Sequence, residues 1–520
     1  MKLHNSRRGR QKNSSESNTS LASSLLQKQI HTNLEMLQTI MGKSTDIITR
    51  KIMMKEEEIF AAVVHISGIS DEEQIDRAII APLLSAQIDC KDIQEAVFQV
   101  KQAISVSNIT IGENWKDVSN AILSGSAAIF IDGWEQAFLA NTTKMQSRSL
   151  TESTTQTVIR GPKDSFTENF GTNVALVRSK LQSQNLRLET MKIGKETQTN
   201  VGMMYIKGIA NNEMVGDVKK NLQRIDIDGV LESAYVETYL RDDTISLFPT
   251  LVNTERPDVV IGNLLEGRIA IFVHGTPYVL IGPATFIQFF QISEDYYGNQ
   301  YISSFIRLLR FISFFISMFV PAIYIALISH HQGLIPTQLL ISMAVQREGV
   351  PFPQIVELFG MEIIFEILHE AGIRMPRAIG QAFSIVGALI IGQAAVQAGI
   401  VSATVVIIVS ITALSTFVIP NYNMSIASRM LRFIFILLAA FLGLYGITLG
   451  FLIVVLHMCG LRSFGVPYMA PISPLRIDEL KDTFIRFPLP SLLKKRPSPA
   501  SSQNKTREEI HNNHEGSNEK

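Results

Sequence analysis

The sequence contains very little cysteine, with only Cys90 and Cys459 among 520 residues. Two cysteines indicate neither a disulfide framework nor a cysteine metal site. Net charge is also absent, because 47 basic residues balance 47 acidic ones. The basic surface typical of nucleic-acid-binding proteins is therefore not indicated, and we expect no nucleic acid partner.

The N-terminus lacks an apolar stretch of signal-peptide length. Residues 1–26 are basic and rich in Ser and Asn, so we expect a disordered tail there. The first long apolar segment begins only after residue 310. We therefore expect the region before it to be soluble and to fold in the cytoplasm.

Long uncharged segments do occur near the end of the chain. No Asp, Glu, Lys or Arg lies between Arg310 and Arg347, and residues 311–331 supply the about twenty apolar residues that a bilayer demands. We expect an all-α polytopic membrane domain over residues 306–460. Its predicted spans are residues 311–331, 378–398, 402–419 and 433–457, with an amphipathic or partly inserted helix at 353–372. A polar tail, 461–520, follows and is expected to be largely disordered after residue 490.

Basic residues predict the topology of this domain. Arg307 and Arg310 precede the first span, and residues 494–496 of the tail are all basic, which places both ends in the cytoplasm. Four crossings satisfy this if residues 353–372 do not cross completely. That arrangement turns four arginines outward, against the rule that basic residues face the cytoplasm: Arg374, Arg377, Arg429 and Arg432.

The soluble region contains an internal repeat. The segment VVHISGIS at 63–70 resembles MYIKGIAN at 204–211, and LSGSAAIFIDG at 123–133 resembles LEGRIAIFVHG at 265–275. Each first block reads as a strand ending at Gly-Ile, and each second block as a helix ending at Gly before a strand. We expect a duplicated α/β region with subdomains at 27–157 and 158–305, so the fold class has two parts: this region and the helical membrane domain.

Catalytic motifs are missing from the sequence. It has no recognisable Ser-His-Asp set, phosphate-binding loop or glycine-rich dinucleotide turn. We therefore predict a protein that is not an enzyme and that carries neither a cofactor nor a metal.

The segment 353–372 carries an acidic face, because Glu362, Glu366 and Glu370 recur at helical spacing. Three interpretations remain open. With His369, Glu366 could form half of a di-metal site, but the second half is not found. The helix could simply be amphipathic and interfacial, or its carboxylates could attract cations near a membrane pathway.

The predicted span 378–398 carries small or polar residues along one face. Such a face lets membrane helices approach closely, or it lines a narrow pore when several copies surround a symmetry axis. Val386 and Ile390 are available as apolar constrictions of such a pore. The other pore or helix-packing candidates are Gln381, Ser384, Ala388, Gly392 and Ala395.

A family resemblance covers the chain from about residue 27 to residue 490. It rests on blocks in the soluble half such as RGPKDSFTENFGTNVALVRSKL, RIDIDGVLESAYVE and LLEGRIAIFVHGTPYVLIGPATF. The membrane half contributes SIVGALIIGQAAVQAGIVS, FVIPNYNMSIASRMLRF and LRSFGVPYMAPISP. These blocks resemble the A subunits of spore germination receptors, the GerA/GerK/GerB A-subunit family.

This resemblance implies a location in the inner membrane of the spore, with the N-terminal region and the C-terminal tail on the core side. It also implies assembly with a transporter-like B subunit, which binds nutrients, and a lipoprotein C subunit. The A subunit would form a homo-oligomer through its membrane helices and conduct cations when triggered. The alternative is a non-conducting scaffold that docks partner subunits. A secondary transporter acting alone is disfavoured, because no inverted repeat is visible in the membrane half.

Overall fold

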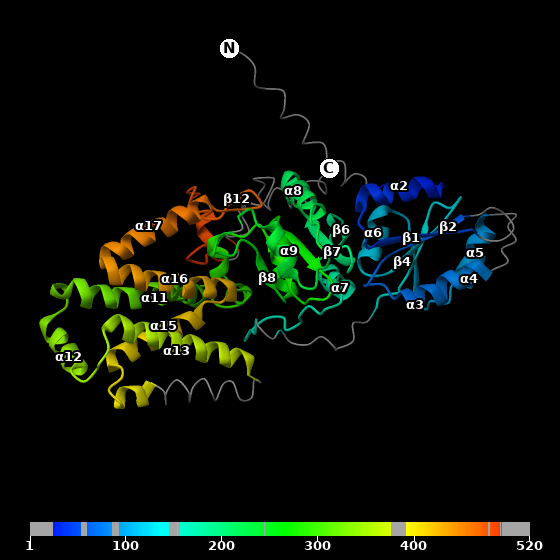
Figure 1. The fold of residues 1–520 in the computed structure, drawn as a ribbon. Helices are drawn as coiled ribbons and strands as arrows, with labels where there is room; N and C mark the ends of the chain where they lie inside the picture. Colours follow the sequence, from blue (N-terminus) through cyan, green and yellow to red (C-terminus); the bar gives the residue numbers. More distant parts are fainter. Residues whose placement is uncertain are drawn as a thin grey trace, which may run out of the picture. The chain divides into compact units, whose positions relative to one another are not determined.

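The computed structural model describes residues 24–53, 60–85, 93–144, 153, 156–243, 245–375, 392–476, 479–488 and 490. The chain forms two compact units, which are described separately here (Figure 1). The α/β unit comprises the chain up to Arg241 together with Leu251–Pro283. The helical unit comprises Asp242–Thr250 and Ala284–Pro499, so it begins earlier than the predicted boundary at residue 306.

The first half of the α/β unit is built on a five-stranded antiparallel sheet with the strand order β1-β2-β4-β5-β3. Its strands are β1 (Ile47–Met53), β2 (Phe60–Ile66), β3 (Ile109–Gly112), β4 (Ala127–Ile131) and β5 (Ala137–Ala140). Its helices are α2 (Ile30–Met41), α3 (Glu72–Ile75), η1 (Asp76–Ile80), α4 (Ala81–Ser85), α5 (Ile93–Ala103) and α6 (Trp115–Leu123).

The second half has a sheet of the same kind, ordered β6-β7-β9-β10-β8 and also antiparallel. Its strands are β6 (Leu186–Ile193), β7 (Thr199–Ile206), β8 (Val252–Thr254), β9 (Ile269–Val273) and β10 (Val279–Gly282). Its helices are α7 (Phe170–Lys180), α8 (Asn212–Gln223), α9 (Ser233–Leu240) and α10 (Pro257–Leu265). When the strands of each half are numbered from one to five, both sheets have the order 1-2-4-5-3.

Strand β2 is covered on both faces of its sheet. Ala62, Val64 and Ile66 point toward the cluster that contains α2 and α6, whereas Ala61 and Val63 point toward η1 and α5. Because neighbouring residues of a strand face opposite sides, a strand covered on both sides must be apolar throughout. The Ala-Ile-Phe runs at β4 and β9 are fully buried for the same reason.

Backbone details also recur between the two halves. Asn33 in α2 accepts a hydrogen bond from the Gln27 N–H and donates one to the Gln27 carbonyl, at 2.9 and 2.6 Å. Asn173 in α7 makes the same pair of bonds with Thr167, at 2.8 and 2.6 Å. Both asparagines are buried, so each ties its helix to the chain six residues earlier without leaving a polar group unpaired.

The glycines that align the repeat also have matching conformations. Gly68 and Gly208 have φ of 87° and 89°, and Gly133 and Gly275 have φ of 87° and 93°. Side chains with a Cβ rarely adopt this region, so glycine is required at these turns.

A buried ion pair joins the two halves of the α/β unit. Arg178 of α7 donates from Nε to Asp46 Oδ2 at 2.7 Å and from Nη2 to Asp46 Oδ1 at 3.1 Å. Both side chains are almost completely buried. The second half further donates the Leu188 N–H to Ser44 Oγ at 2.9 Å. Burial, together with the charge of nearby Arg178, lowers the pKa of Arg187 to about 10.

The helical unit is built from α11 (Gln300–His330), α12 (Thr337–Arg347), α13 (Gln354–Arg374), α15 (Ala403–Val418), α16 (Tyr422–Leu442) and α17 (Leu444–Gly460). Shorter elements are η2 (Phe286–Phe290), η3 (Ser293–Tyr296), η4 (Gln332–Leu334), β11 (Arg462–Ser463), β12 (Val466–Pro467) and η5 (Glu479–Asp482). Within the described parts of the chain, α11 and α16 are both long and apolar enough to cross a membrane, and α15 and α17 are shorter apolar helices.

The single helix expected over residues 433–457 is two helices in the structure. The chain turns at Gly443, whose φ of 61° ends α16 and starts α17. A Cβ at Gly450 would lie 2.7 Å from Leu438 Cδ1 and 2.9 Å from Phe435 Cε1. The glycines of this segment therefore allow α17 to fold back closely onto α16, a role that hydropathy alone does not reveal.

Contacts between helices give their directions. Ser317 in α11 bonds Ser428 in α16 at 3.2 Å, and the His330 ring bonds the Ala440 carbonyl at 2.8 Å, so these two helices run in the same direction. Glu362 lies beside Arg432, and Glu366 lies beside Arg429. Helix α13 therefore runs in the opposite direction to α16.

We predict that Asp46→Asn destabilises the α/β unit by about 3–5 kcal/mol, because it leaves the buried Arg178 guanidinium without its counter-charge. The measurement is chemical denaturation of the full-length protein in detergent. The control is Asp226→Asn, since Asp226 pairs with Lys195 at the surface and should contribute less than about 1 kcal/mol. Equal losses in the two variants would contradict the role of the buried pair.

We also predict that the α/β unit loses stability in mild acid. Burial lowers the pKa of His65 below 6.5, an effect that Glu72 and Asp76 only partly offset. The unfolded chain takes up a proton near pH 6.5 while the folded chain does not. The stability that depends on neutral His65 is therefore fully present above pH 6.5. It is lost as the pH falls toward the pKa of His65 in the folded chain.

Urea midpoints at about pH 7.5 and about pH 5.5 measure this dependence, and His65→Gln should flatten it. The matched control is His31→Gln, because the His31 side chain is 74% exposed. An unchanged pH dependence in the His65 variant would refute the assignment.

Candidate functional site

Most residues of the predicted pore face lie outside the described residues, namely Gln381, Ser384, Val386, Ala388 and Ile390. The structure does describe Gly392 and Ala395. A Cβ at Gly392 would lie 3.4 Å from Val406 of α15, so this small residue meets a neighbouring helix. The Ala395 carbonyl accepts from the Ile400 N–H at 3.0 Å, where the chain turns before α15.

The acidic face of α13 is described completely, and each of its carboxylates lies beside an arginine. Glu362 is 3.1 Å from Arg432 Nη1, and both side chains are fully buried. Glu366 accepts a hydrogen bond from Arg429, which lies on α16 as Arg432 does. Glu370 is exposed and pairs with Arg374 one turn later, at 2.6 Å.

His369, the partner considered for a metal, lies in an aromatic environment. Its ring is 5.3 Å from the ring of Phe417 and 6.2 Å from the ring of Phe365. Glu366 is hydrogen-bonded to Arg429. In this structure the two residues of the Glu-x-x-His pattern therefore contact an arginine and aromatic rings.

A further carboxylate of α13, Glu357, was not selected from the sequence. It accepts hydrogen bonds from the N–H of Ser402 at 2.5 Å and from its hydroxyl at 2.6 Å. Ser402 is the N-cap of α15, so a negative charge is placed at the positive end of that helix. Arg347 lies 3.7 Å from the same carboxylate. The sequence feature that could have identified Glu357 is its position as an acidic residue inside an otherwise apolar turn.

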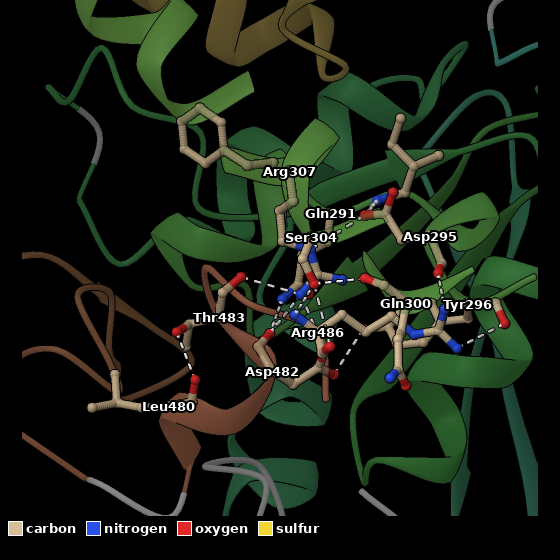
Figure 2. A network of polar contacts seen from close by, with 12 residues as sticks. Gln291, Asp295, Tyr296, Gln300, Ser304, Arg307, Leu480, Asp482, Thr483 and Arg486 are labelled. Carbon is tan, nitrogen blue, oxygen red and sulfur yellow. Dashed lines mark hydrogen bonds and ion pairs between the residues drawn. The ribbon is translucent and has the colours of Figure 1, made fainter. Parts of the chain in front are cut away.

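A second polar cluster lies at the beginning of α11 (Figure 2). Asp295 accepts from Arg310 at 2.9 Å and from Arg307 at 3.3 Å. Their positions before the first apolar segment predict that these two arginines flank the membrane. The structure buries both of them against a carboxylate instead.

The C-terminal segment completes this cluster. Asp482 accepts from Arg307 Nη1 at 3.0 Å and from the Tyr296 hydroxyl at 2.8 Å. Arg486 donates to the carbonyls of Asp295 and Gly298, at 2.6 and 2.9 Å. The segment is thereby fixed to the start of α11, 175 residues earlier in the sequence.

The Tyr296 ring lies close to two guanidinium groups of this cluster, those of Arg307 and Arg486. Arg307 is 5.8 Å and Arg486 is 5.6 Å from the ring centre, within the range of cation–π attraction. Figure 2 shows Asp295, Tyr296 and Gln300 on one side of the arginines, and Asp482 and Thr483 on the other. These groups hold helices and segments together. Their arrangement is that of a structural ion network in which the charges are bound to one another.

Comparison with known proteins gives the family. The sequence profile of the Bacillus/Clostridium GerA spore germination protein family matches residues 35–498. The chain belongs to the GerA family of spore germination proteins. The match includes both units and therefore the α13 carboxylates and the cluster at the start of α11.

Individual relatives match this GerA-family chain over most of its length. Spore germination protein KA of Bacillus subtilis (strain 168) is 45% identical over 486 residues, covering 93% of this chain and 89% of the relative. Spore germination protein GerLA of Bacillus cereus is 38% identical, covering 90% and 94%. The crystal structure of the N-terminal domain of the A subunit of the Bacillus megaterium spore germinant receptor GerK3 is 38% identical and covers 51% of this chain and 99% of that chain, with a TM-score of 0.41.

For this GerA-family protein we predict that Asp482→Asn releases the C-terminal segment from α11. The substitution removes the charge that Arg307 faces, and charge-assisted bonds are about twice as strong as neutral ones. Trypsin should then cleave after Arg486 faster than in the unsubstituted protein, as followed by mass spectrometry. Glu370→Gln is the control, because it removes an exposed pair of the same unit. Identical cleavage rates would show that the Asp482 carboxylate does not hold the segment.

Proposed function

We propose that this protein is the A subunit of a nutrient-responsive germinant receptor, which crosses a membrane through its helical unit and forms a gated cation pore as a homo-oligomer. The observation that carries the proposal is the family match over residues 35–498, together with relatives whose names identify them as spore germination proteins. Assembly with a transporter-like B subunit and a lipoprotein C subunit in the spore inner membrane is part of the proposal.

The surface of the helical unit supports a membrane location. Large apolar side chains are exposed along the long helices, including Leu414, Phe417, Phe441, Tyr445 and Leu456. Exposed apolar area of this extent is unfavourable in water and favourable against lipid. Residues of the α11 start and of the C-terminal segment meet at one end of the unit, which supports placing both on the same side of the membrane.

The direction of α13 suggests a different topology from the four crossings expected above. Helix α13 has 21 residues, about 31 Å at 1.5 Å per residue, which is close to the thickness of the hydrocarbon core. We propose that α13 crosses the membrane. Because it runs opposite to α16, Arg374 then lies at the end where α11 and α16 begin, on the same side as Arg307 and Arg310.

This topology also accounts for Arg429 and Arg432. In it they need not face outward, because both are buried and lie beside carboxylates of α13. Ionisable groups inside a membrane domain occur almost entirely in such paired, inward-facing positions. We further propose that the α/β unit arose by duplication, which the shared strand order and the Asn33 and Asn173 bonds support.

We predict that Val386→Ala or Ile390→Ala makes spores release ions prematurely or at lower nutrient concentration, because a smaller side chain widens an apolar constriction. Ion release from spores carrying each variant is the measurement. Ile407→Ala is the control, since Ile407 is exposed on the apolar surface of α15. Unchanged ion flux across a scan of residues 378–398 would remove this helix from the pore.

A second candidate is a non-conducting scaffold that docks partner subunits. The pairing of Glu362, Glu366 and Glu370 with arginines favours it, because paired carboxylates attract cations weakly. Ion-flux and partner-binding measurements on purified protein, reconstituted alone in vesicles, distinguish the pore from the scaffold. A cation flux that the pore-helix variants alter supports the pore, whereas no flux together with retained partner binding supports the scaffold.

A further inference from the structure

The contact between α13 and α16 contains two carboxylates and two guanidinium groups, which we call the α13–α16 polar contact: Glu362, Glu366, Arg429 and Arg432. Glu362 and Arg432 have no exposed area, and Arg429 is 7% exposed. The Arg432 guanidinium lies 5.8 Å from the Phe433 ring, which is itself 5.4 Å from the Phe359 ring. Glu362, Arg432 and Arg429 are therefore enclosed by protein, whereas the Glu366 side chain is 35% exposed.

Most polar atoms of this contact lack a hydrogen bond within the described structure. Both oxygens of Glu362 and all three nitrogens of Arg432 have none, although the two side chains approach to 3.1 Å. Glu366 Oε2 and Arg429 Nε are unbonded as well, while Glu366 Oε1 accepts from Arg429 Nη1. The charges are thus close together but poorly aligned.

Such an arrangement is unfavourable unless another molecule completes it. A buried donor or acceptor left unsatisfied lowers the stability of the folded protein, and a charged one lowers it more. A buried ion pair is favourable only when further hydrogen bonds satisfy its remaining lone pairs and protons. Native proteins keep few unsatisfied groups, so several in one contact indicate a bound molecule.

The charge balance identifies the class of that molecule. Two carboxylates and two guanidinium groups cancel, so the contact has no excess charge with which to hold a cation or an anion. Its open positions include acceptors on Glu362 and donors on Arg432, side by side. A small neutral molecule that both donates and accepts is required, and buried water typically fills this role with about three hydrogen bonds.

We propose that ordered water occupies the α13–α16 polar contact and bridges Glu362 to Arg432. Helix α13 is then held to α16 by bonds through water in addition to the direct bond between Arg429 and Glu366. This inference does not depend on the pore, and it holds equally for a scaffold.

The test measures whether a water-borne anionic reagent reaches position 362. The full-length protein with Cys90→Ala and Cys459→Ala, in detergent, receives Glu362→Cys and is treated with a methanethiosulfonate that carries a sulfonate group. The reagent needs a thiolate, which water and the neighbouring Arg432 both favour. We expect modification about tenfold faster than in either of two control variants of the same helix.

The controls are chosen on α13 itself. Leu358→Cys tests the protein interior, because Leu358 is fully buried. Ile363→Cys tests the apolar outer surface, because Ile363 is 43% exposed. A rate at position 362 as low as that at position 358, in folded protein, would overturn the proposal.

The modification also restores a negative charge opposite Arg432. We therefore expect the sulfonate adduct to raise the melting temperature of the Glu362→Cys variant, whereas a cationic reagent of similar size should not raise it. A purely steric role of the side chain would give the same result with both reagents.

Should Glu362→Cys fail to fold, the unsubstituted protein decides the question. Water density within ~3.2 Å of the Glu362 carboxylate in a high-resolution cryo-electron microscopy map is the expected result. Direct paired hydrogen bonds between Glu362 and Arg432, with no water between them, would overturn it.

Discussion

Arginine buried against carboxylate from a distant part of the chain is the interaction on which both units depend. Arg178 binds Asp46 and joins the two halves of the α/β unit. Arg307 binds Asp295 and Asp482 and attaches the C-terminal segment to α11. A guanidinium removed from water must keep its counter-charge, so neither partner can move away without exposing an unpaired charge in the interior. Each pair therefore fixes the position of two elements that are far apart in sequence.

The two halves of the α/β unit show how one pattern can be used twice with different surroundings. Both sheets have the order 1-2-4-5-3, and both first helices carry a buried asparagine bonded to the chain six residues earlier. Yet α7 carries Arg178, which reaches the first half, whereas the region before β1 supplies Asp46. The halves differ where they meet, because a contact between two similar bodies needs complementary charges on the two sides.

The helical unit combines apolar exteriors with charged interiors. The carboxylates Glu357, Glu362 and Glu366 of α13 have partners on α12, α15 and α16. This distribution is the reverse of that in a water-soluble bundle, whose charges face outward. This distribution supports the membrane location proposed for the helical unit. A second group of buried charges lies at the start of α11.

Local sequence determined much of this protein. The strands at 127–131 and 269–273 follow from continuous apolar runs after glycine, and the helical end of the chain follows from long uncharged segments, because burial and periodicity are local properties. The glycines that predict a repeat have positive φ, which only particular turns require. The pairing of charges could not be predicted from the sequence. Arg307 and Asp482 are 175 residues apart, and no local pattern records which arginine meets which carboxylate. The turn at Gly443 and the direction of α13 were likewise decided by tertiary packing, since hydropathy measures how apolar a segment is and not where it folds back.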